Sequence, residues 1–221
     1  MSKLFLLRHL KSQWNLDKEF AGWVDNPLST EGILAAKEMA EKLKNEKIDV
    51  GYTSPLVRNM ETLLRIFEHN PDKYPLFIHL DGGKMQMWGK FTDLNNDDMP
   101  VYVSEKLNER YYGKLQGLNK DQITTQYGEQ KVHLWRRGYK NRPPGGESLK
   151  DVYDRAVPFF KKYIIKELSK NKNVLVVASH NSLRAIVKFI EHISDEDIAN
   201  VELPFGSLMQ YEFNGNFTIK R

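Results

Sequence analysis

The chain of 221 residues contains no cysteine. It can therefore form no disulfide, no thiol nucleophile and no thiolate metal site. Long hydrophobic runs are also missing: no stretch approaches the roughly 18 apolar residues of a membrane span, and the apolar run near Met1 is too short for a signal peptide. These absences predict a cytoplasmic protein without a membrane partner.

Basic residues are in small excess. The 33 Lys and Arg residues outnumber the 29 Asp and Glu residues, and only 10 of the 33 are arginine. The lysines are scattered, no run of five like charges occurs, and no basic tract is interleaved with aromatic residues. The pattern predicts no nucleic-acid partner. It also makes the few arginines informative, because a guanidinium group matches phosphate oxygens in bidentate fashion.

Short apolar runs alternate with amphipathic segments. We expect strands at 3–7, 48–52 and 174–178, and a closing hairpin of 206–213 and 216–220 that turns at Asn214-Gly215. This alternation predicts a single α/β domain over residues 1–221, with a mostly parallel central sheet.

The expected helices follow from caps and apolar spacing. One begins at Ser29 or Thr30, and another runs from Pro55, capped by Ser54, to about residue 67. A third spans 150–168 with a kink or break at Pro158, and Ser182 can cap a fourth.

Residues 69–104 interrupt the alternation. The turn at 81–83, the strand-like spacing of Met85 and Met87 and the polar stretch 94–100 predict an inserted hairpin around 81–100. A solvent-exposed elaboration, a lid and a subunit contact all remain open for it.

Two histidines follow expected strands. His9 comes after Leu4–Leu7 and His180 after Val174–Ala178, with Arg8 and Arg184 close by. Since ligands of open α/β sheets bind at the carboxyl ends of strands, we expect both histidines in one site. A neutral imidazole can attack phosphorus, and no carboxylate stands at the spacing of a zinc motif such as H-E-x-x-H. The arginines predict an anion, not a metal.

Several sequence blocks carry a family resemblance. Residues 7–15, LRHLKSQWN, resemble the LRHGxSxWN signature of the histidine phosphatase superfamily. Further blocks resemble its branch of 2,3-bisphosphoglycerate-dependent phosphoglycerate mutases and occur in family order: FAGW at 20–23, TSPLVR at 53–58, LNERYYG at 107–113 with GLNK at 117–120, WRR at 135–137 and HNSLR at 180–184. The resemblance covers most of residues 3–213.

The resemblance implies a three-layer α/β/α, phosphoglycerate mutase-like fold and an isomerase of glycolysis and gluconeogenesis. Such an enzyme interconverts 3-phosphoglycerate and 2-phosphoglycerate through a phosphohistidine, with 2,3-bisphosphoglycerate as the phosphoryl primer and no metal. The partner would be a small phosphorylated acid. The resemblance also implies a homo-oligomer, first of all a dimer.

The resemblance also assigns roles. His9 matches the histidine that accepts the phosphoryl group, and Glu109 matches the general acid and base. Arg8, Arg58 and His180 match the pocket around the transferred phosphoryl group. The other matched positions are expected to bind substrate: Asn15, Ala21, Gly22, Tyr112, Lys120, Arg136, Arg137 and Asn181.

The chain departs from the family pattern in places that bear on the reaction. Leu10 replaces a glycine after His9, and the usual glycine after the second histidine is missing at His180-Asn181. We expect the two changes to be coupled, with Leu10 near the turn at 179–181.

The chain also ends soon after its last expected strand, where mutases of this branch carry a longer tail that helps to exclude water. If such exclusion is required here, residues 81–100 are the candidate for a lid. A phosphomonoester phosphatase and an inactive phosphate-binding scaffold remain open as alternatives.

Overall fold

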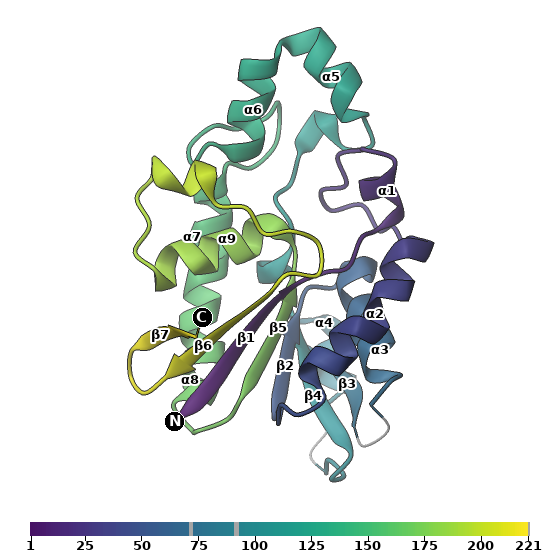
Figure 1. Ribbon diagram of the computed structural model, residues 1–221, viewed down its shortest axis with the longest axis vertical. Coiled ribbons are helices and arrows are strands. Elements are labelled where there is room, and N and C mark those ends of the chain that lie inside the picture. Colours follow the sequence, from purple (N-terminus) through teal and green to yellow (C-terminus); the bar gives the residue numbers. More distant parts are fainter. Residues whose placement is uncertain (71–72, 91–92, 221) are drawn as a thin grey trace.

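A computed structural model describes residues 1–70, 73–90 and 93–220. The described residues form one seven-stranded sheet (Figure 1). Its strands are β1 (Ser2–Arg8), β2 (Val50–Thr53), β3 (Tyr74–His79), β4 (Asp98–Val103), β5 (Val174–Ala178), β6 (Leu208–Phe213) and β7 (Phe217–Lys220). They lie in the order β3-β4-β2-β5-β1-β6-β7. The strands from β3 to β1 pair in parallel, whereas β6 and β7 pair antiparallel.

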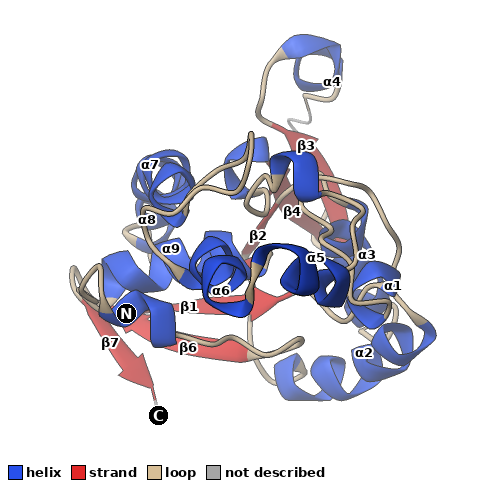
Figure 2. Ribbon diagram, turned by 90° about the horizontal axis from the view of Figure 1, so that it is seen from above, coloured by secondary structure: helices blue, strands red, loops and turns tan. Residues whose placement is uncertain are grey.

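Helices cover both faces of the sheet, which confirms the predicted three-layer α/β/α architecture. Figure 2 shows α2 and α3 on one side and α7, α8 and α9 on the other. The α-helices are α1 (Gln13–Leu16), α2 (Thr30–Leu43), α3 (Val57–Phe67), α4 (Gly83–Trp88), α5 (Lys120–Tyr127), α6 (Glu129–Arg137), α7 (Leu149–Phe159), α8 (Ile165–Leu168) and α9 (His180–Ile190). Short 3-10 turns cover Glu105–Leu107, Gly113–Leu115 and Asp197–Asn200.

The core follows from the two-residue period of a strand. Leu4 and Leu6 of β1 pack in the cluster that includes residues of α7, α8 and α9, whereas Phe5 and Leu7 pack in the cluster of α2 and α3. Every residue of β5 is buried, as expected for a central strand that is covered on both faces.

Two helix starts differ from the prediction. Helix α3 begins at Val57 with Leu56 as its N-cap. The Ser54 hydroxyl accepts from Asn59 Nδ2 at 2.6 Å and from the backbone N–H of Leu56 at 3.4 Å, so Ser54 lies before the helix. Helix α9 begins at His180 with Ser179 as its N-cap, so Ser182 lies one turn inside the helix. The second shift matters for the site, because it places His180 in the first helical turn.

The irregularity predicted at Pro158 takes the form of a π-helical turn two residues later, and the backbone stays helical. Pro158 lies in α7, and a π-helical turn over Phe160–Ile164 separates α7 from α8. Proline supplies no backbone N–H, which weakens the regular hydrogen-bond ladder at this point.

The prediction of an inserted hairpin around 81–100 is wrong. Strands β3 and β4 pair in parallel, from Tyr74 opposite Asp98 to His79 opposite Val103, and their connection contains α4. Met85 and Met87 lie in this short helix with exposed side chains, so their alternate spacing reflected no strand. Figure 2 shows α4 standing away from the layers, beyond the β3 edge of the sheet.

Among the described residues, no helix combines the length and apolar character that a bilayer crossing requires.

Candidate active site

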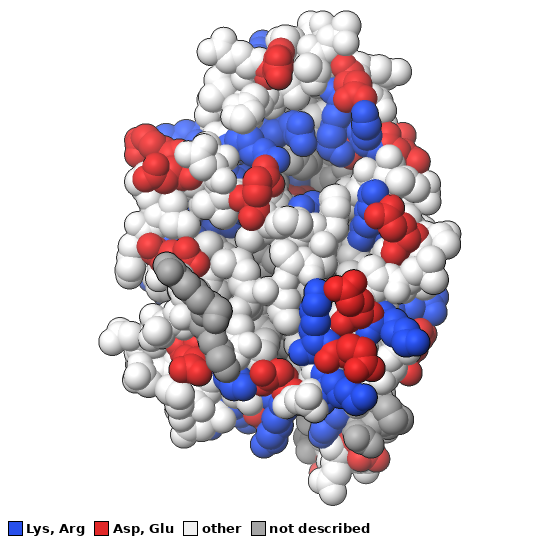
Figure 3. All heavy atoms as spheres, viewed as in Figure 1, with Lys and Arg blue, Asp and Glu red and all other residues white. Residues whose placement is uncertain are grey.

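A cleft of about 440 Å³ opens where β1 and β5 end, below helices α5 and α6. Figure 3 shows Lys and Arg side chains gathered around a hollow in the corresponding part of the surface. All the residues that the sequence nominates line this cleft: His9, Glu109, His180, Arg8, Arg58, Asn15, Ala21, Gly22, Tyr112, Lys120, Arg136, Arg137 and Asn181. The fold thus collects groups that are distant in the sequence at one edge of the sheet.

His9 is held in one tautomer at the end of β1. Its Nδ1 lies 2.6 Å from the carbonyl oxygen of Leu10, and a carbonyl can only accept, so Nδ1 carries the proton. The lone pair of the neutral ring is therefore on Nε2. Burial, followed by the positive charges of Arg58 and Arg8, lowers the pKa of His9 well below its ordinary value. At neutral pH the ring is unprotonated and can act as a nucleophile.

Arg8 and Arg58 place fixed positive charge beside His9. Arg58 donates to the carbonyl oxygens of Gly22 at 2.7 Å and Val24 at 3.0 Å, while Arg8 Nη1 donates to the carbonyl oxygen of Leu203 at 2.5 Å. The buried Nε atoms of both arginines have no hydrogen-bond partner among the described residues. Burial lowers the pKa of Arg8 to about 10, which still leaves it charged. Unsatisfied, charged donors of this kind suit a phosphoryl group.

Glu109 is a buried carboxylate of the cleft. It precedes the buried Arg110, whose backbone N–H donates to Glu109 Oε1 at 2.6 Å, and Asn181 Nδ2 donates to the same oxygen at 2.6 Å. Burial raises the pKa of Glu109, but His180 and these two hydrogen bonds outweigh burial, so the pKa lies below its ordinary value. Without a bound anion, Glu109 is therefore ionised.

Asn181 orients the Glu109 carboxylate. Its Oδ1 accepts from Arg184 Nη1 at 3.0 Å and from Arg110 Nη2 at 3.2 Å, which leaves Nδ2 to donate to Glu109. The same Nδ2 also donates to the Tyr112 hydroxyl at 3.3 Å. The side chain of Asn181 thus holds Glu109 and Tyr112, whereas the sequence motif predicted only substrate binding at this position.

His180 is paired with an acidic residue that the sequence analysis missed. Its Nε2 lies 3.4 Å from Glu202 Oε2 and 3.5 Å from Arg137 Nη1, and Glu202 also forms an ion pair with Arg137. Burial lowers the pKa of His180 to about 4 despite the neighbouring carboxylate, so the ring is neutral at pH 7. Glu202 is half-exposed, with 53% of its side-chain surface accessible.

The outer part of the cleft carries further positive charge. Arg136 and Arg137 close α6, and Lys120 opens α5 and donates to the carbonyl oxygen of Glu19 at 2.6 Å. Burial and then the nearby Arg136 lower the pKa of Lys120 to about 8. A bound anion would raise the pKa of Lys120 again, which favours binding of a second negatively charged group here.

Phe205 is the other notable omission from the sequence analysis. The Arg8 guanidinium lies 3.7 Å from the centre of the Phe205 ring, and the ring centres of His9 and Phe205 are 5.8 Å apart. Glu202 and Phe205 precede β6, which pairs antiparallel with β1 and so begins at the edge where β1 ends. The turn signal Pro204-Phe205-Gly206 was available, but the direction of β6 was not predicted. The cleft is also lined by Lys18, Glu19, Phe20 and Asp121.

Leu10 is buried in the apolar cluster that includes Leu7 and Leu28. Its backbone N–H donates to Thr62 Oγ1 at 3.1 Å, and its Cδ2 would lie 3.2 Å from a Cβ at Gly206. Leu10 therefore fills space under the Phe205 turn. Its coupling to the altered motif at 179–181 stays a prediction.

The described ranges contain no group of three or more His, Cys, Asp or Glu side chains that could hold a metal ion. None of the described residues between 81 and 100 lines the cleft, which leaves the expected lid without support.

Comparisons with known proteins agree with this geometry. The sequence profile of the histidine phosphatase superfamily (branch 1) matches residues 4–92 and 91–220. A 2,3-bisphosphoglycerate-dependent phosphoglycerate mutase of Methanococcus vannielii is 44% identical over 97% of this chain and 92% of its own length. Its namesake in Chlamydia abortus is 45% identical over 98% and 96% of the two chains.

A solved structure shares the fold. A mycobacterial glucosyl-3-phosphoglycerate phosphatase in complex with VO3 matches with a TM-score of 0.78 at 21% identity, over 100% of this chain and 98% of that chain. The profile and the two mutases carry the assignment further. The chain belongs to branch 1 of the histidine phosphatase superfamily and, within it, to the 2,3-bisphosphoglycerate-dependent phosphoglycerate mutases.

Proposed function

We propose that this phosphoglycerate mutase interconverts 3-phosphoglycerate and 2-phosphoglycerate through phosphorylated His9, primed by 2,3-bisphosphoglycerate. The observation that carries the proposal is the state of His9: its Nδ1 proton is tied to Leu10, which leaves Nε2 free beside two arginines with unpartnered Nε donors. The cytoplasmic location and the dimer expected from the sequence belong to the same proposal.

The primer fits the residues of the cleft. Arg8 and Arg58 would hold the phosphoryl group that is transferred, and Lys120, Arg136 and Arg137 would hold the carboxylate and the second phosphate. The bisphosphate supplies a phosphoryl group, so that His9 is phosphorylated before the monophosphate binds. His180 and Asn181 lie in the first turn of α9, where the positive end of the helix also favours an anion.

His9 and Glu109 divide the chemistry between them. His9 Nε2 forms a bond to phosphorus as the bond from phosphorus to the ester oxygen breaks, and that oxygen takes the electron pair and a proton from Glu109. The arriving phosphoryl group raises the pKa of Glu109 by adding negative charge beside it, so Glu109 is protonated when an acid is needed. Arg8 and Arg58 stabilise the charge on the phosphoryl oxygens in the transition state.

The reverse transfer produces the isomer. Glu109, now ionised, takes the proton from the free hydroxyl of 3-phosphoglycerate while that oxygen bonds to phosphorus. The bond from phosphorus to His9 Nε2 breaks, and its electron pair returns to the ring. The bisphosphate formed in the cleft then reorients. His9 next accepts the other phosphoryl group, which releases 2-phosphoglycerate and restores phosphorylated His9.

Labelling tests the covalent step. We expect incubation with 2,3-bisphosphoglycerate to place one phosphoryl group on His9, in a linkage that acid hydrolyses and base does not. His9→Asn should remove the label, whereas His133→Asn, an exposed position outside the cleft, should keep it. Label that survives in His9→Asn would overturn the assignment of the nucleophile.

A further inference from the structure

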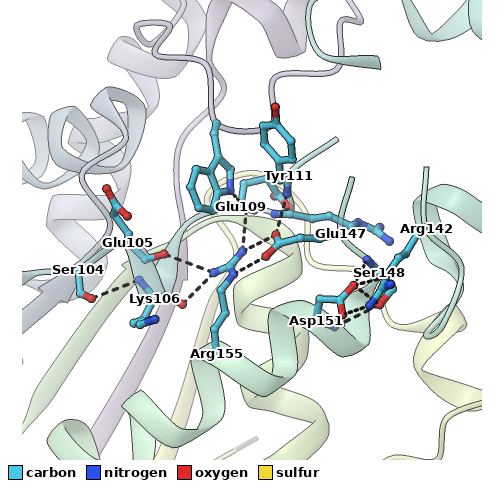
Figure 4. A network of polar contacts seen from close by, with 12 residues as sticks. Ser104, Glu105, Lys106, Glu109, Tyr111, Arg142, Glu147, Ser148, Asp151 and Arg155 are labelled. Atoms are coloured by element: carbon cyan, nitrogen blue, oxygen red, sulfur yellow. Dashed lines mark hydrogen bonds and ion pairs between the residues drawn. The ribbon is translucent and has the colours of Figure 1, made fainter. Parts of the chain in front are cut away.

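An arginine outside the cleft contacts the backbone of Glu109 (Figure 4). Arg155 projects from α7 with 13% of its side chain exposed. Its Nη2 donates to the carbonyl oxygen of Glu109 at 2.9 Å, and its Nη1 donates to the carbonyl oxygen of Lys106 at 2.9 Å. Arg155 does not line the cleft, so it contacts only the backbone of Glu109, on the side away from the cleft.

Glu147 links Arg155 to the chain that follows Glu109. Its carboxylate accepts from Arg155 Nε at 2.9 Å and from Arg155 Nη2 at 3.0 Å, and its Oε2 also accepts from the backbone N–H of Tyr111 at 2.9 Å. The backbone N–H of Glu147 donates to the carbonyl oxygen of Tyr111 at 2.8 Å. The ion pair thus holds the chain both at Glu109 and two residues beyond it.

Trp23 joins the same carbonyl to the phosphoryl pocket. Trp23 Nε1 donates to the Glu109 carbonyl oxygen at 2.5 Å, and the preceding residue, Gly22, accepts from Arg58. The Glu109 carbonyl oxygen therefore accepts hydrogen bonds from two separate elements, α7 and the 20–24 loop.

These contacts matter because residues 108–112 belong to no helix or strand. The segment has no regular backbone ladder to fix its path, so the direction of the Glu109 side chain depends on outside groups. A displacement of about 1 Å at a proton donor can slow a reaction by about two orders of magnitude.

We propose that Arg155, paired with Glu147, is a positioning residue that holds Glu109 in line for proton transfer. The inference rests on the proposed role of Glu109 as the general acid. Its consequence is specific: loss of Arg155 impairs those steps in which the leaving oxygen needs a proton, and spares those in which it does not.

A comparison of leaving groups tests the proposal. Phosphorylation of His9 is followed in single turnovers with 2,3-bisphosphoglycerate, whose alkoxide needs a proton, and with p-nitrophenyl phosphate, whose phenolate leaves without one. We expect Arg155→Lys and Glu147→Gln to slow the first reaction about 10- to 100-fold and the second less than about threefold.

A matched control lies in the neighbouring ion pair. Arg142 forms a bidentate pair with Asp151, which lies on α7 as Arg155 does. Among the described residues, no contact joins Arg142 to Glu109 (Figure 4). Arg142→Lys should change neither rate. If Arg155→Lys is too unstable to assay, Glu147→Gln carries the same test, since it removes the charge that holds the guanidinium.

Glu109→Gln tests the general-acid role of Glu109 separately from the positioning role of Arg155. It should slow the bisphosphate reaction far more than the p-nitrophenyl reaction. If Glu109→Gln slowed both equally, the general-acid role would be overturned. If Glu109→Gln discriminated between the leaving groups but Arg155→Lys and Glu147→Gln slowed both equally, or neither, the positioning role of Arg155 would be overturned.

Discussion

At the scale of single residues, the two cleft histidines are kept neutral by burial among arginines. The unfolded chain lacks this environment, so each histidine there titrates near the ordinary pKa of about 6.5. The folded His180 does not bind a proton until the pH approaches about 4. Between these values the unfolded state binds more protons, and the free energy of unfolding must fall as the pH falls.

This difference predicts a pH dependence of stability. We expect His180 to lower the free energy of unfolding by on the order of 3 kcal/mol as the pH falls from 6.5 to about 4. Urea unfolding at a series of pH values measures the slope. In His180→Asn the slope over this window should be shallower; an unchanged slope would contradict the account of His180.

Glu202 contacts two residues, Arg137 and His180, to which we assign a role in binding the substrate. It pairs with Arg137 and His180 at the mouth of the cleft, where an incoming anion must compete with it. A half-exposed ion pair is worth about 1 kcal/mol at most, so Glu202→Gln should tighten the binding of inorganic phosphate by up to about fivefold.

Isothermal titration at pH 7 measures this change. Glu196→Gln, an exposed neighbour outside the cleft, serves as the control and should bind phosphate as the unaltered protein does. Weaker binding by Glu202→Gln would mean that Glu202 holds Arg137 and His180 in place, and does not compete with the anion.

At the scale of elements, the segment around Glu109 is packed tightly against the 143–148 turn. Gly113 has a φ of +57°, and a Cβ there would collide with the carbonyl of Pro144 and lie 2.6 Å from Gly146 N. Gly145 has a similar φ of +69°, but a Cβ there meets no atom within 4 Å.

The two glycines form a matched pair for a test of this packing. Gly145→Ala should cost only backbone strain, about 1 kcal/mol, whereas Gly113→Ala adds the collision and should cost about 3 kcal/mol. Urea unfolding measures both. Equal losses in the free energy of unfolding would show that the segment around Gly113 can move away from the 143–148 turn without destabilising the fold.

Helix α4 provides a second test at this scale. Because its side chains do not line the cleft, replacement of Met85, Met87 and Trp88 by serine should leave the ratio of phosphate release to isomer formation unchanged. A clear increase in phosphate release, measured against the unaltered protein, would show that α4 does act as a lid.

The sequence predicted most of the elements that position the site. The apolar runs of β1 and β5 and the cap of α2 were sufficient, because local patterns decide such elements. The starts of α3 and α9 were wrong because Ser54 and Ser182 bond other partners, which local propensity does not reveal. The prediction for the region of β3 and β4 failed because short apolar segments do not indicate whether they pair in parallel or antiparallel.

At the scale of the whole molecule, the motifs nominated residues that the fold does gather into one cleft. The residues that the sequence analysis missed, Glu202 and Phe205, arrive there through the antiparallel course of β6. Contacts such as that between Asn181 and Glu109, which are 72 positions apart, depend on the packing of separate elements. No motif predicts them.

The central claim is that the cleft transfers a phosphoryl group between two hydroxyls of one substrate and does not lose it to water. Incubation with 3-phosphoglycerate and a trace of 2,3-bisphosphoglycerate, with 2-phosphoglycerate and free phosphate measured together, tests this claim most directly. The account predicts rapid formation of 2-phosphoglycerate with little free phosphate, and no isomer from His9→Asn. Release of phosphate without the isomer would contradict it and identify a phosphatase.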